Sequence, residues 1–250
     1  MTKKIDKYKV QAALVRSFFD AFSHGVIESQ MEDRNEKTTP QSVKKLMLEH
    51  YEHIAPAFFD TMFFPLAAMN YKYEDIAALA REAQQRGDDM MALVRTACGD
   101  EAYYNAMVEE YKRNFSMLLA GRYISNADHL EGYVRKAEDE TEASVDSDRA
   151  IELTVRVVMF AYVRGLRQTG EGARFDRSAH LRQVHPLRGA TLFRLMLDAM
   201  NILLLDEAVD FADAEAADLA SLFLKVCQTQ HNFTVMTNEM DRTYSELMKE

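Results

Sequence analysis

The sequence contains no tryptophan and little glycine, proline or cysteine, with nine, four and two copies of the last three in 250 residues. So little glycine and proline cannot supply the many tight turns of a β-sandwich, and the composition therefore favours helices. The two cysteines, Cys98 and Cys227, lie far apart and fit no paired-cysteine zinc spacing. Because nothing at the N-terminus resembles a secretory signal, we expect reduced thiols in a cytoplasmic protein.

Sequence motifs of the common enzyme classes are also missing. There is no Gly-x-Ser-x-Gly elbow, no phosphate-binding glycine-rich loop, no dinucleotide fingerprint and no His-Glu-x-x-His pair. We therefore expect no cofactor, no metal and no catalytic residue, which favours a protein that is not an enzyme. No apolar run approaches the ~20 residues of a membrane helix, so no membrane contact is expected. The formal charge of −10 disfavours nucleic acid as a partner.

Apolar residues recur at helical spacing along the chain, and neither strand-like alternation nor an internal repeat is evident. We therefore expect an all-α protein, a single multi-helix bundle over residues 1–250. The acidic stretch 138–148 is the best candidate for a subdomain boundary. A buried central helix is predicted near 190–207, because this segment is apolar almost all the way round. A long C-terminal helix is predicted near 214–248, after a cap at Asp213.

Several helix ends carry clear sequence signals. Thr39 and Pro40 predict a helix start, since threonine can cap a helix and proline is favoured at its first position. A break is expected near Gly87, and Asp100 is expected to cap the next helix. The segment between Pro56 and Pro65 is expected to form a short helix of its own, and residues 149–168 another helix that packs on the central one.

The predicted C-terminal helix has an apolar residue at every seventh position. These residues are Leu219, Val226, Phe233, Met240 and Leu247. The spacing indicates a coiled-coil-like seam, which has two uses. The seam either packs along the bundle of its own chain, or its end binds another protein or a second copy of this chain. In the second case the contact residues are Phe233, Met240, Tyr244 and Leu247.

An arginine-rich segment precedes the predicted central helix. Between residues 162 and 194, seven arginines face only Glu171 and Asp176, which gives a local charge of +5. Arginine recognises phosphate and carboxylate through paired hydrogen bonds, so the segment is a candidate site for a phosphate-bearing ligand, a nucleotide or RNA. The candidate ligand residues are Arg174, Arg177, His180, Arg182, His185, Arg194 and Asp198. The alternative is that the arginines pair with the acidic residues of 206–218.

Within this segment, the seven residues from Arg174 to His180 read RFDRSAH. This spacing resembles the Arg-x4–6-His pattern of HEPN-type helical ribonucleases. The resemblance implies that Arg174 would hold phosphate and His180 would act as an acid or base. A polar residue usually follows the arginine in that family, whereas Phe175 stands here.

Two smaller groups of polar residues were also considered. In the sequence LEHYEH, Glu49 and His53 lie four residues apart and share a helix face. Solvated surface, a metal and a pH-sensing role are its three interpretations. On the predicted central helix, Arg194 and Asp198 form either an intrahelical salt bridge or one wall of a pocket.

We expect a non-enzymatic regulatory or adaptor protein that acts by protein–protein interaction through helical surfaces. The regular C-terminal seam and the adjacent arginine-rich and acidic segments favour this class. The alternative is a helical enzyme or sensor that binds a phosphate-bearing ligand in the segment 164–194.

Overall fold

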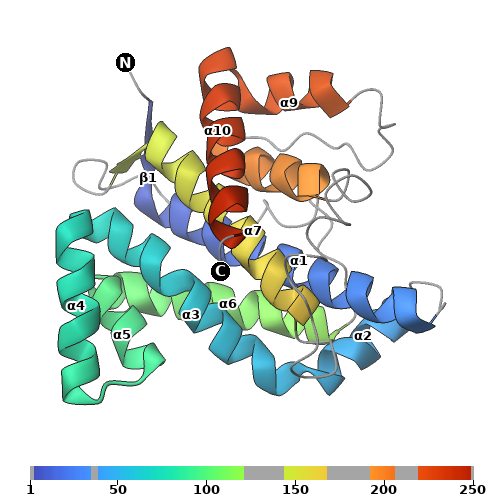
Figure 1. The fold of residues 1–250 in the computed structure, drawn as a ribbon, viewed down its shortest axis with the longest axis horizontal. Coiled ribbons are helices and arrows are strands. Elements are labelled where there is room, and N and C mark those ends of the chain that lie inside the picture. The colour runs from blue at the N-terminus through green and yellow to red at the C-terminus, as the bar shows by residue number, and fades with distance from the viewer. Residues whose placement is uncertain (1–2, 35–38, 121–143, 168–191, 206–218, 249–250) are drawn as a thin grey trace.

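The computed structural model describes residues 3–34, 39–120, 144–167, 192–205 and 219–248, and almost all of them are helical (Figure 1). The predicted all-α fold is confirmed. The elements are β1 (Lys4–Asp6), α1 (Lys7–Arg34), α2 (Pro40–Glu49), α3 (Tyr51–Asn70), α4 (Tyr73–Arg86), α5 (Met90–Ala97), α6 (Glu101–Leu119), β2 (Ser144–Asp146), α7 (Ser147–Arg167), a helix over 192–204, α9 (Leu219–Cys227) and α10 (Gln230–Leu247).

Helices α1 and α7 form the centre of the structure and cross at Gly25 and Gly165. A Cβ atom on Gly25 would lie 2.2 Å from the carbonyl oxygen of Tyr162, and one on Gly165 would lie 2.2 Å from the carbonyl oxygen of Phe22. No side chain fits at that distance, so glycine at both positions is what lets the two backbones approach. The buried apolar side chains of the described residues form a single cluster around this crossing.

The two crossing helices belong to an internal repeat, which the sequence analysis did not detect. Strands β1 and β2 pair antiparallel, with Ile5 opposite Val145. These residues lie 140 positions apart, as do Gly25 and Gly165. The contacts at the crossing are reciprocal at the same spacing, because Phe22 corresponds to Tyr162. The expectations of no repeat and no strand are therefore wrong.

A second pair of elements extends the repeat with a spacing of 129 residues. Helices α5 and α6 correspond to α9 and α10, with Cys98 matching Cys227 at the end of the shorter helix. Both junctions contain a left-handed residue, Gly99 with φ 72° and Gln228 with φ 63°. The predicted unbroken helix over 214–248 is therefore wrong. Helix α9 ends at Cys227, α10 begins at Gln230, and the two lie at a steep angle (Figure 1).

Side-chain hydrogen bonds stabilise this break between α9 and α10. Thr229 caps α10 by accepting from the backbone N–H of Asn232 at 3.1 Å. Gln228 donates from its amide to the carbonyl of Leu204 at 3.1 Å. This bond ties the junction to the end of the helix over 192–204, whose last carbonyls have no partner within their own helix.

The helix predicted near 190–207 is described over 192–204. Its apolar residues are buried, and these are Leu195, Met196, Leu197, Ala199, Met200, Leu203 and Leu204. It does not lie alone at the centre, because α1 and α7 make the central crossing. The predicted boundary at 138–148 lies partly outside the described residues, and Ser144–Asp146 of that stretch forms β2.

Most predicted helix ends are confirmed. Thr39 caps α2, Asp100 caps α6, and Gly87 ends α4 in the left-handed conformation. The exception is the segment with two prolines, since Pro56 and Pro65 lie inside one continuous helix, α3. The apolar residues that α3 buries offset the backbone hydrogen bonds that proline removes.

Candidate functional site

A buried ion pair joins α1 to α6 in the first half of the chain. The Nε of Arg16 donates to Oε1 of Glu110 at 2.7 Å, and both side chains are almost fully buried. Asn114 donates to the same oxygen at 3.0 Å, and Arg113 reaches Oε2 of Glu110 at 3.2 Å. Because a buried carboxylate is stable only when it is paired and hydrogen-bonded, these contacts fix α6 on α1.

The second half carries an equivalent cluster between α7 and α10. Arg156 contacts Oε1 of Glu239 at 3.3 Å and Oε2 of Glu246 at 2.8 Å. Thr243 donates to Glu239 at 3.2 Å, and Arg242 pairs with it at 2.6 Å. Burial disfavours the charge on Arg156, but the hydrogen bonds and charges of the two glutamates outweigh it and raise its pKa.

The two clusters occupy equivalent positions in the repeat, Arg16 matching Arg156 and Glu110 matching Glu239. A function in one half would not require the same cluster in both, whereas the fold would. We therefore interpret them as structural. Neither cluster was predicted from the sequence, because a lone arginine in an apolar helix gives no signal without its distant glutamate. The repeat would have provided that signal, since it aligns both residues.

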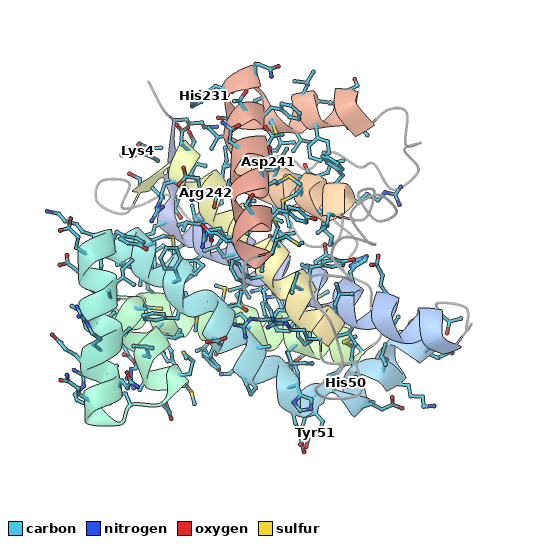
Figure 2. The ribbon with its side chains drawn as sticks, viewed as in Figure 1. Lys4, His50, Tyr51, His231, Asp241 and Arg242 are labelled. Atoms are coloured by element: carbon cyan, nitrogen blue, oxygen red, sulfur yellow. The ribbon has the colours of Figure 1, made fainter. Side chains whose placement is uncertain are left out.

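Another candidate surface is the corner between α2 and α3. Leu48 and Tyr51 are exposed large apolar residues there, with 47% and 51% of their surface accessible. An open hollow of about 430 Å³ lies on the exposed face of α2, and the residues that line it all belong to this helix: Gln41, Lys44, Lys45, Leu48 and Glu49. Figure 2 shows His50 and Tyr51 on the outer side of this corner. We call these residues, 41–53, the α2–α3 corner.

The LEHYEH residues lie in this corner. Tyr51 donates from its hydroxyl to Glu52 at 3.0 Å, and the rings of His50 and His53 lie 6.3 Å apart. Within the part of the chain that the structure describes, no three His, Cys, Asp or Glu residues lie close enough together to hold a metal ion. The described geometry of this motif therefore gives no support to the metal interpretation.

Most of the predicted anion-binding residues lie outside the described residues. They are Arg174, Arg177, His180, Arg182 and His185. The RFDRSAH stretch and the acidic segment 206–218 lie there too. On the helix over 192–204, Arg194 is exposed and Asp198 is half-buried. Asn201, three residues after Asp198, is fully buried.

The predicted interaction residues of the C-terminal seam face the core of the chain. Leu247 is buried, and Phe233, Met240 and Tyr244 are partly buried and pack against the main apolar cluster. Helix α10 packs on α7, and its buried residues are Met236, Glu239, Thr243 and Leu247. Of the four predicted contact residues only Leu247 is among them, and binding of a partner by the other three stays a prediction.

Both thiols are buried at the ends of equivalent helices. Burial raises the pKa of Cys98 to about 12 and that of Cys227 to about 11. Thiols with such pKa values carry almost no thiolate at neutral pH, so neither is suited to be a nucleophile.

No helix among the described residues is long and apolar enough to cross a bilayer. Comparison with models of known protein families, with curated proteins and with solved structures finds no match to this chain.

Proposed function

We propose that this protein is a non-enzymatic regulatory or adaptor protein, and that it binds an amphipathic helix of a partner protein at the α2–α3 corner. The observation that carries the proposal is the exposure of two large apolar residues near each other in the sequence, Leu48 and Tyr51, of which Leu48 also lines the hollow on α2. Exposed large apolar residues beside charged ones are typical of interaction sites.

The chemistry of the corner specifies the partner. Covering the exposed parts of Leu48 and Tyr51 would stabilise a complex by about 1 kcal/mol each, at roughly 25 cal/mol per Å² of apolar surface. Lys45 and Glu49 pair with each other at 3.9 Å, whereas Lys44 favours an acidic residue on the rim of the partner helix. The partner helix therefore has an apolar face with an acidic residue beside it.

The test is site-specific photo-crosslinking in the cells that make the protein. A photoreactive amino acid replaces Leu48 or Tyr51, and the control carries it at Gln85, an exposed position on α4. The proposal predicts the same partner protein in adducts of the two corner variants and not in adducts of the control. Adducts that are equally abundant and varied at all three positions would refute it.

A further inference from the structure

A small pocket of about 130 Å³ lies between α3 and α7, outside the surfaces described above. It is lined by Asp60, Thr61, Phe64, Pro65, Arg156, Val157, Phe160 and Arg164. A water molecule takes up about 30 Å³ in the liquid, so the pocket holds a ligand of only a few non-hydrogen atoms.

Arg156 forms one wall of this pocket, and its contacts hold it there. Its guanidinium carbon lies 5.3 Å from the ring centre of Phe64 and 5.7 Å from that of Phe160. Glu239 and Glu246 hold it from the side of α10. Arg156 is therefore fixed in position between two aromatic walls, with its charge paired to the two glutamates.

Arg164 and Asp60 form an ion pair that also lines the pocket. Asp60 is the more exposed of the two, with 43% of its side chain accessible, against 29% for Arg164. A half-exposed pair of this kind contributes only about 1 kcal/mol to stability, so an incoming carboxylate can replace Asp60 at small cost.

We propose that the pocket between α3 and α7 binds a small aliphatic carboxylate, whose carboxylate group pairs with Arg164 in place of Asp60. The apolar part of the ligand lies against Phe64 and Phe160. Inorganic phosphate and sulfate have no apolar part to cover these rings, so they bind more weakly. Asp60 then acts as an internal competitor for the site.

The experiment is an NMR titration of the full chain with sodium propionate at constant ionic strength, observed through the arginine Nε–Hε signals. We expect saturable shifts of the Arg156 and Arg164 signals, with a Kd in the millimolar range, about what a ligand this small can reach. Asp60→Asn should lower the Kd about two- to fivefold because it removes the competitor, and Arg164→Gln should raise it at least as much.

The matched control is the exposed pair of Arg86 and Asp88 on and beside α4. Arg86→Gln and Asp88→Asn should leave the Kd unchanged. Asp60→Asn changes no buried group, so it tests the proposal even if Arg164→Gln unfolds. The proposal is overturned by shifts that do not saturate, by a Kd that Asp60→Asn leaves unchanged or raises, or by phosphate or sulfate that binds as tightly as propionate.

Discussion

Gly25 and Gly165 face each other's helices where α1 crosses α7, at equivalent positions of the two halves. A Cβ atom at either position would lie 2.2 Å from a backbone oxygen that cannot move without shifting the helix. The two halves are thus joined by two copies of one unit, a short strand followed by a helix. The strands of the two copies pair, and the helices cross.

Alanine at this crossing should therefore be strongly destabilising. Gly25→Ala and Gly165→Ala should each lower the free energy of unfolding by about 3 kcal/mol or more, because the helices must move apart. Urea denaturation followed by circular dichroism measures this. The control is Gly87→Ala, where φ is 73° and no atom lies within 4 Å, and which should cost only about 1 kcal/mol. Equal losses at all three positions would contradict the close crossing.

Substitutions of Arg16 and Glu110, which form a buried ion pair, should have non-additive effects on the free energy of unfolding. Arg16→Met alone should cost about 3–5 kcal/mol because it leaves the Glu110 carboxylate buried beside fewer donors. The double variant Arg16→Met, Glu110→Met should cost less than the sum of the two single variants by at least about 1 kcal/mol. A double-mutant cycle of denaturation measurements tests this, and additive losses would show that the pair contributes nothing as a pair.

The free energy of unfolding should fall at alkaline pH because His24 loses its charge there. Burial opposes its charge, but Asp20 and Glu28 outweigh this and raise its pKa from 6.5 to about 9. A raised pKa in the folded state stabilises the fold below the unfolded value of 6.5, and this contribution is lost as the pH rises through 9. With 26% of the side chain exposed, we expect a contribution of about 1–2 kcal/mol.

The measurement is the difference in unfolding free energy between the wild type and His24→Gln at several pH values. The difference should be largest near pH 6 and should vanish above the folded pKa of about 9. A difference that stays constant from pH 6 to pH 10 would mean that His24 is not charged by its neighbours.

The α9–α10 junction allows a separate test of the repeat. Gln228 has φ 63° and its counterpart Gly99 has φ 72°. Gln228→Ala and Gln228→Gly both lose the hydrogen bond to Leu204, so their difference reports on the backbone alone. The alanine variant should be less stable than the glycine variant by about 1 kcal/mol, the cost of the left-handed conformation. Gly99→Ala should cost about the same. Thermal denaturation measures both. Equal stability of the two Gln228 variants would contradict the left-handed conformation, and an alanine variant more stable than the glycine variant by about 1 kcal/mol would indicate a continuous helix there.

Local signals in the sequence predicted local structure well. Thr39, Gly87 and Asp100 act as expected because capping and the left-handed conformation depend on a few neighbouring residues. The break at Gln228 was not predicted, because it does not depend on neighbouring residues. A glutamine carries no turn signal, and the hydrogen bond that holds it goes to Leu204, far away in the sequence.

Long-range relationships were harder to predict. The repeat keeps few identical residues, among them Arg16 with Arg156 and Glu110 with Glu239, and its spacing changes from 140 to 129 residues between them. A comparison at one fixed spacing therefore finds only part of it. The exposure of Leu48 could not be predicted from the sequence either, because a leucine in an amphipathic helix is usually buried.

The most direct test of the proposed function is the affinity of the purified, crosslinked partner for variants of the α2–α3 corner. Leu48→Lys and Tyr51→Glu should each weaken binding at least about tenfold, since they put a charge where an apolar contact is expected. Gln85→Lys on α4 should bind like the wild type. If the two corner variants keep wild-type affinity while remaining folded, the corner is not the binding surface and the proposed function fails.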